Sequence, residues 1–324
     1  MNIDNKQLNQ AISTYQKYLG DSNLEFFDIA SLDRIGIPIQ FASFRTSDGF
    51  QNNGFGYGHN AAESLVGALG ELSETFHTFN ALKTIPACEG TSYQEMVQLF
   101  GQEFVIDPLT LCLCAGFPYH HHLPLRWVQV SRFQDGAKCW IPKESVAFSK
   151  YSYEMHSSNV VVQNNVASSK LFPPITCGLG AGLSMEQALS HGILELLQRD
   201  GNCTRFRALD KGIDINLDRI QSEEIRATIH HLASLGLQVR AKLATTEFGL
   251  INLYVIADQA DEHYLEQFPI VTTACGEAVH LNRERALRKA LHEFMSSRAR
   301  KTFSHGPIAD VIALASADYL NQSL

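Results

Sequence analysis

Glutamates occupy the middle of three predicted helices, and each of these helices follows a loop that contains glycine. Carboxylate oxygens are ligands that Mg²⁺ accepts, and Mg²⁺ usually accompanies nucleotide phosphates. A glycine loop that leads into a helix also presents free backbone N–H groups and a partial positive charge, which suit a phosphate. The pattern therefore favours a Mg-nucleotide site built from helices. The glutamates are Glu71 with Glu74, Glu195 and Glu293, and the arginines that follow two of them are Arg199 and Arg298.

The segment 175–200, ITCGLGAGLSMEQALSHGILELLQRD, shows this plan most clearly. Its glycines form a turn, and Ser184 stands where it can cap the helix that follows. At 100° per residue, one face of that helix is apolar and another is polar. The apolar face is Met185, Ala188, Leu189, Gly192, Ile193 and Leu196, and the polar stripe is Gln187, His191, Glu195 and Gln198.

Each segment by itself also fits an ordinary surface helix. A lone glycine-rich loop is weak evidence for a nucleotide. Glu71 and Glu74 are like charges at i, i+3, which is tolerable where water solvates both, although a divalent cation would reverse the repulsion. The chain contains no GxxxxGK[ST] motif and no kinase-type loop, so the common nucleotide-binding folds are not supported.

Composition is that of a globular protein with a large core: 45% of the 324 residues are hydrophobic and 19% are charged. The formal net charge is -8 without a long basic run, which argues against nucleic acid as a partner. No apolar stretch reaches transmembrane length, and the N-terminus is polar, so no membrane association is expected. The seven cysteines form no CxxC pair, which favours a reducing cytoplasm.

Periodicity predicts the elements that would position these residues. Helices are expected at 5–19, 61–80, 184–200, 216–235 and 283–300, with a short one in 306–324. Strands are expected at 39–44, 109–116, 125–132, 159–166, 237–244, 250–257 and 269–273, a glycine-broken loop at 51–60, and a turn at the histidines 120–122. No linker composition marks a domain boundary, so a single domain is expected.

At these residues the sequence resembles the YcaO family. The blocks that carry the resemblance keep the family's order and cover most of the chain from about 30 to 300. They are LDRIGIP (32–38), GYG…GALGELSET (56–75), GLGAGLSMEQALSHGILELLQRD (178–200) and GEAVHLNRERALRKALHEFMSSR (276–298).

The resemblance implies an ATP- and Mg²⁺-dependent enzyme that phosphorylates the oxygen of a peptide-backbone amide, leading to an azoline, thioamide or amidine. Its substrate would be a ribosomally made peptide or a protein, and the resemblance also allows a peptide-delivering partner protein and a homo-oligomer. Carried over residue by residue, Mg²⁺ or polar groups of ATP would be held by Glu71, Glu74 and Glu195, and phosphate charge would be neutralised by Arg199. Gln198, Glu293 and Arg298 match further positions of the ATP-binding blocks, and no catalytic residue is assigned.

The sequence departs from the family pattern inside these blocks. Uncharged residues stand where the family has lysine, serine, an arginine or other polar residue, asparagine and glutamates: Tyr57, Gly67, Thr75, Leu183, Gln187 and Gln198. Glutamine can still form hydrogen bonds, but it lacks the full negative charge that a metal attracts. An alternative is therefore a YcaO-like scaffold with a degenerate nucleotide site that binds a peptide or a partner subunit without catalysis.

The expected fold is α+β, with mixed, mainly antiparallel sheets and helices packed on them around a central nucleotide cleft. A single YcaO-like domain is expected over 1–324, with 1–30 as a helical lead-in and 301–324 as a short tail. The three helices that carry the glutamates should meet at that cleft.

Overall fold

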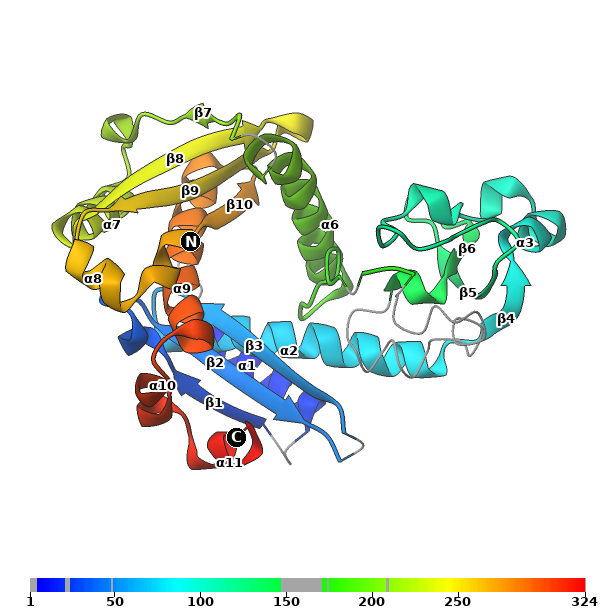
Figure 1. Cartoon of the computed structure of the whole chain (residues 1–324), viewed down its shortest axis with the longest axis horizontal. Coiled ribbons are helices and arrows are strands. Elements are labelled where there is room, and N and C mark those ends of the chain that lie inside the picture. The colour runs from blue at the N-terminus through cyan, green and yellow to red at the C-terminus, as the bar shows by residue number, and fades with distance from the viewer. Residues whose placement is uncertain are drawn as a thin grey trace. The chain divides into compact units, whose positions relative to one another are not determined.

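The computed structural model describes residues 5–20, 24–47, 49–146, 171–173, 175–207 and 210–323. The chain divides into two compact units. Unit 1 is Met1–Glu74 with Cys177–Leu324, and unit 2 is Thr75–Thr176. The single domain expected over 1–324 stays a prediction. Helices and antiparallel sheets occur in both units, which confirms the α+β class (Figure 1).

The elements follow one another from an N-terminal helix to two short C-terminal helices. The helices are α1 (Asn5–Leu19), α2 (Ala61–Thr84), α3 (Tyr93–Phe100), α6 (Met185–Asn202), α7 (Glu223–Ser234), α8 (Glu262–Gln267), α9 (Arg283–His305), α10 (Ile308–Leu314) and α11 (Ala317–Ser323). The strands are β1 (Leu24–Asp28), β2 (Ile39–Arg45), β3 (Gln51–Tyr57), β4 (Ala87–Ser92), β5 (Pro124–Ser131), β6 (Lys138–Pro142), β7 (Ile213–Asp214), β8 (Leu237–Thr245), β9 (Ile251–Gln259) and β10 (Gly276–His280).

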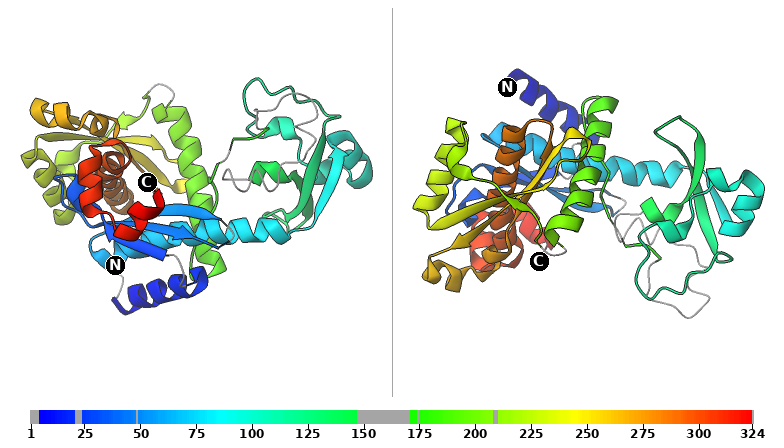
Figure 2. Two further views of the ribbon diagram at one scale, coloured as in Figure 1. Left: turned by 60° about the horizontal axis from the view of Figure 1, so that its bottom comes forward. Right: turned by 90° about the horizontal axis from the view of Figure 1, so that it is seen from above.

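Unit 1 contains two antiparallel sheets, with strand orders β1-β2-β3 and β10-β9-β8-β7. Helix α9 lies against the four-stranded sheet, as Figures 1 and 2 show. The face that the sequence predicts for this helix is buried there. Its side chains Ala286, Leu287, Ala290 and Phe294 pack with Leu253, Val255 and Ala278 of the sheet.

Glycines bring the edge strands of these sheets unusually close to the helices. A Cβ on Gly54 would lie 2.5 Å from the carbonyl oxygen of Ala68 in α2. A Cβ on Gly276 of β10 would overlap the carbonyl oxygen of Ala290 in α9. The prediction of a loop at 51–60 is wrong, because most of this segment pairs with β2 as strand β3. Its glycines allow close packing of the strand against α2 and do not mark a loop.

Gly276→Ala is expected to lower the free energy of unfolding by about 1–3 kcal/mol or more, because the new methyl group overlaps helix backbone that cannot rotate away. Gly70→Ala on α2 is the matched control. A Cβ there meets only the end of the Tyr15 side chain, at 3.8 Å from its hydroxyl oxygen, so the better helix former should add roughly 0.5–1 kcal/mol. Urea unfolding of both variants checks the pair, and equal effects would contradict the packing described.

Two further predicted strands are wrong, and one predicted helix is confirmed with a later start. Residues 109–116 form no strand: a 3₁₀ turn covers Pro108–Thr110 and irregular backbone follows. Residues 269–273 form a 3₁₀ helix that begins with a proline, and the strand comes later, as β10. The helix predicted from 216 begins at Glu223, because Ser222 caps it and the chain before it makes only a 3₁₀ turn. The strand predicted at 159–166 lies outside the described residues.

Unit 2 packs a three-stranded sheet, in the order β4-β5-β6, with α3 around the fully buried Trp127. The predicted strand at 125–132 is confirmed as β5. Among the predicted histidines, His121 starts the expected turn, and its Nε2 lies 3.0 Å from Asp107 Oδ1. Within the described ranges, none of the helices is both long enough and apolar enough to cross a membrane.

Candidate functional site

The three glutamate-bearing helices of unit 1 repeat one contact. In each, a glutamate carboxylate accepts a hydrogen bond from a backbone N–H of the strand or loop that precedes the helix, 16 or 17 residues earlier. This bond fixes the carboxylate against the edge of the packed backbone. From donor N to acceptor Oε2, the bonds are Phe55 to Glu71 at 2.7 Å, Gly178 to Glu195 at 3.2 Å and Glu277 to Glu293 at 3.3 Å.

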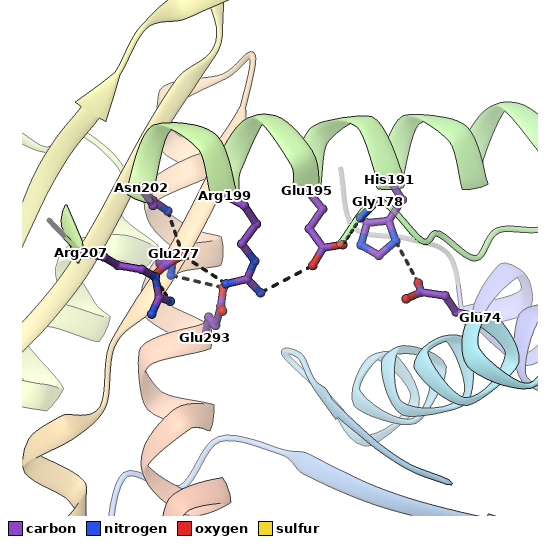
Figure 3. Close-up of polar contacts among 9 residues, drawn as sticks. All are labelled: Glu74, Gly178, His191, Glu195, Arg199, Asn202, Arg207, Glu277 and Glu293. Carbon is purple, nitrogen blue, oxygen red and sulfur yellow. Dashed lines mark hydrogen bonds and ion pairs between the residues drawn. The ribbon is translucent and has the colours of Figure 1, made fainter. Parts of the chain in front are cut away.

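Glu74, one turn after Glu71 on α2, points toward α6 (Figure 3). Its Oε2 lies 3.8 Å from His191 Nδ1, and its side chain is only 11% exposed. Burial, with added repulsion from Glu195 and Glu71, raises the pKa of Glu74 to about 8. The pair that the sequence alone would leave solvated is therefore largely withdrawn from water.

Arg199 links the carboxylates of α6 and β10, as Figure 3 shows. Its Nη2 lies 3.6 Å from Glu195 Oε1, and its Nη1 lies 3.5 Å from Glu277 Oε2. The guanidinium remains 38% exposed, so its other face can reach an anion that approaches from solvent.

We call Glu71, Glu74, Glu195, Glu277 and Glu293 the carboxylate group. Glu277 is not among the residues predicted from the sequence. Its side chain is 2% exposed and lies within reach of three donors. Arg207 Nη2 is 2.7 Å from Oε1, and Asn202 Nδ2 is 3.0 Å from Oε2. Arg199 Nη1 is the third donor, at 3.5 Å from Oε2. A signal was present in the sequence, since a glutamate within the strand GEAVH has to find partners if that strand is buried.

Several of these carboxylates are harder to ionise than an exposed glutamate. Burial raises the pKa of Glu71, with repulsion from Glu195 adding to it, although Arg300 and the bond from Phe55 lower it. Burial likewise raises the pKa of Glu293 to about 7. A nearby divalent cation makes the ionisation of such carboxylates favourable again, because its charge offsets both their desolvation and their mutual repulsion. Carboxylate oxygens such as those of Glu71, Glu74 and Glu195 are the type of ligand that Mg²⁺ accepts.

A model of the YcaO family, described as "YcaO cyclodehydratase, ATP-ad Mg2+-binding", matches residues 55–322. The chain belongs to the YcaO family. Both ATP and Mg²⁺ are thus cofactors of its family, and the family's matched region contains every glutamate of the group above.

Solved structures of YcaO proteins and heterocyclases share this fold. The YcaO protein from Methanopyrus kandleri, bound with AMPPCP and Mg²⁺, is 17% identical with a TM-score of 0.60, over 93% of this chain and 69% of that one. A heterocyclase in complex with substrate and cofactor is 15% identical with a TM-score of 0.65, over 89% of this chain but 39% of that one. The E. coli microcin synthetase McbBCD complex is 15% identical with a TM-score of 0.57, over 86% and 65%.

Two predicted residues make contacts with residues outside this YcaO carboxylate group. Arg298 is 2% exposed and forms a bidentate pair with Asp33, with Nε to Oδ2 at 2.7 Å and Nη2 to Oδ1 at 3.3 Å. Gln198 is buried on α6, and its backbone carbonyl accepts a hydrogen bond from Asn252 Nδ2 at 3.1 Å. The roles of both in ATP binding stay predictions.

The positions where this YcaO chain departs from the family pattern have defined local roles. Burial raises the pKa of the Tyr57 hydroxyl well above its usual value, with Glu293 adding to the effect. Gln187 Oε1 accepts a hydrogen bond from Leu183 N at 2.9 Å, so it helps to cap α6. Gly67 lies on α2 where a Cβ would be 3.1 Å from Gly56 Cα, which leaves little room for the family's serine.

Arg298→Ala is expected to lower the free energy of unfolding by about 3–5 kcal/mol, because it leaves the Asp33 carboxylate buried without its partner. Arg240→Ala is the matched control: it removes an arginine from an exposed pair with Asp214 and should cost less than about 1 kcal/mol. Urea unfolding measures both. If Arg298→Ala kept wild-type stability and lost only ATP affinity, Arg298 would act in the nucleotide site instead.

Proposed function

We propose that this YcaO protein uses Mg·ATP to activate a backbone amide of a ribosomally made peptide or a protein. The amide oxygen receives the γ-phosphoryl group of ATP, ADP leaves, and the oxygen departs as phosphate when a nucleophile takes its place on the carbon. A Cys, Ser or Thr side chain as nucleophile closes an azoline ring, whereas a sulfide gives a thioamide. The observation that carries this proposal is the approach of the largely buried Glu71 and Glu74 on α2 to Glu195 on α6, whose charge helps to raise the pKa of both α2 carboxyls.

In this proposal the acidic residues bind the metal ion and the basic residue binds the phosphates. Glu71, Glu74 and Glu195 would hold Mg²⁺ through their carboxylate oxygens, which their backbone and side-chain contacts already orient. Arg199 would neutralise charge on the phosphates, since its guanidinium is anchored on two carboxylates and still partly exposed. Glu293 would act at the edge of the group, where its pKa of about 7 allows it to gain or lose a proton.

A non-catalytic scaffold is the second candidate, and one observation favours it. The large side chains of the predicted apolar face of α6 are exposed: Met185 is 70% exposed and Leu196 is 50% exposed. An apolar helix face of this kind suits a bound peptide or partner protein. A peptide-delivering partner protein remains part of the main proposal too, because the similar E. coli microcin synthetase was solved as a complex.

Peptide-dependent ATP hydrolysis separates the two candidates. The purified protein is given Mg·ATP with short peptides encoded by neighbouring genes, and ADP release and peptide mass are followed. We expect ADP formation that requires the peptide, with loss of one water from the peptide or replacement of oxygen by sulfur when sulfide is supplied. Tight peptide binding without ADP release, in the presence of any partner protein encoded nearby, would favour the scaffold.

A further inference from the structure

A second group of metal-ligating side chains lies in unit 1, formed by His59, Glu224 and His292. His59 lies in the bend between β3 and α2, Glu224 in the first turn of α7, and His292 in the middle of α9. One ligand atom from each comes within 4.8 Å of those of the other two. His59 Nε2 lies 3.4 Å from Glu224 Oε1, and the two imidazole rings meet edge to face with centroids 4.6 Å apart.

We propose that His59, Glu224 and His292 bind a first-row divalent transition-metal ion, for which Zn²⁺ is the best match. Two imidazole nitrogens and one carboxylate oxygen are a donor set that Zn²⁺ and its neighbours in the series accept. Three protein ligands also leave a fourth position of a tetrahedral ion open to water or another small ligand.

The geometry needs little change to hold such an ion. Zn–ligand bonds of about 2.0–2.2 Å place two ligand atoms of a tetrahedral ion roughly 3.4 Å apart. Side-chain rotations that move the ligand atoms by about 1 Å therefore bring all three to bonding distance of one ion. The side chains of His59 and Glu224 are 40% and 48% exposed, which leaves a path for the ion from solvent.

Neighbouring groups already orient the ligands. The backbone N–H of His59 donates to Glu63 Oε2 at 2.9 Å, which fixes the bend that carries the imidazole. Arg288 Nη1 lies 3.3 Å from Glu224 Oε2, so the guanidinium holds the oxygen that the ion would not use. Arg288 also places a positive charge near the ion. The negative charges of Glu63 and Glu224 offset the charge of this arginine.

The group is distinct from the carboxylates that we assign to Mg²⁺. It shares no residue with Glu71, Glu74 and Glu195. His292 is next to Glu293 on α9, and consecutive side chains point about 100° apart around a helix. The ligand types differ as well, since imidazole suits transition metals whereas an all-carboxylate set suits Mg²⁺. An ion here would tie the start of α2, the start of α7 and the middle of α9 to one another.

Zinc titration of the metal-stripped full-length protein tests the proposal. Competition with a chromophoric chelator, in excess Mg²⁺, measures the affinity, and Co²⁺ in place of Zn²⁺ reports the coordination geometry from its visible spectrum. We expect one bound Zn²⁺ and a tetrahedral Co²⁺ spectrum. His59→Ala, His292→Ala and Glu224→Gln should each weaken binding at least about 100-fold, since even the loss of an outer partner costs about 10–100-fold.

His263→Ala is the matched control, because His263 is also a histidine beside a glutamate but is 80% exposed and outside the group. It should bind Zn²⁺ as the wild type does. Glu195→Gln is tested as well, to exclude zinc held by the other carboxylates. Wild-type zinc affinity in the three ligand variants, or no zinc bound by the wild type, would overturn the proposal, and neither result depends on whether ATP is hydrolysed.

Discussion

Glu195→Gln is expected to weaken the binding of Mg·ATP about 100-fold or more while the protein stays folded. Glutamine keeps an oxygen that can accept the hydrogen bond from Gly178 N, but it removes one negative charge beside the metal. A charge pair at 4 Å is worth about 4 kcal/mol at an effective dielectric constant of 20, so the loss covers at least two decades in affinity. Calorimetric titration of each protein with ATP in excess Mg²⁺ measures it.

Glu186→Gln is the control for this variant. Glu186 lies in the first turn of the same helix, is exposed and belongs to no part of the carboxylate group. The same change of charge and shape there should leave ATP affinity within a factor of about two. Equal losses in Glu195→Gln and Glu186→Gln would show that only the overall charge of α6 matters, and would contradict a metal held by Glu195.

Glu74→Gln is expected to make the metal-free protein more stable at pH 8 than the wild type, by up to about 4 kcal/mol. The pKa of Glu74 rises from 4.5 to about 8 on folding, so the unfolded state releases the proton first. The stability that the protonated group supplies is full below pH 4.5 and is lost as pH rises from 4.5 through 8. Glutamine stays neutral throughout and avoids that loss.

Urea unfolding with a chelator at pH 4.5 and at pH 8 measures this difference. The two proteins should be nearly equal at pH 4.5, because Glu74 is then protonated in the folded state. The order should reverse in saturating Mg²⁺ and ATP at pH 8, since only the wild type gains the bound cation. A variant that is less stable than the wild type at pH 8 without metal would contradict the buried, repelled carboxylate described here.

The recurring features of the site could be predicted from sequence because they are local. A glycine stands 17 residues before each of Glu71, Glu195 and Glu293, on a strand or loop that packs against the helix, and the three copies of this spacing can be read from the sequence. The choice of these three glutamates rests on this shared plan of loop and helix together with the resemblance to the YcaO blocks. The buried face of α9 followed from helical periodicity.

The features that the sequence did not predict depend on tertiary pairing. Glu277 joins the group through Asn202 and Arg207, which are 75 and 70 residues away, so no local pattern marks it. Arg298 follows a glutamate as Arg199 does, yet it lies where Asp33, 265 residues away, takes its guanidinium. Similarly, the glycines of β3 predicted a loop, because their packing role becomes visible only when α2 is placed against them.

Proton release on nucleotide binding tests the central claim most directly. Calorimetric titration of the wild type with Mg·ATP at pH 7, in two buffers of different ionisation enthalpy, counts the protons exchanged. With the pKa of Glu74 at about 8 and that of Glu293 at about 7 before binding, we predict Mg²⁺-dependent binding that releases about one proton. Binding that needs no Mg²⁺ and releases no proton, or no binding at all, would contradict a nucleotide site built from these carboxylates.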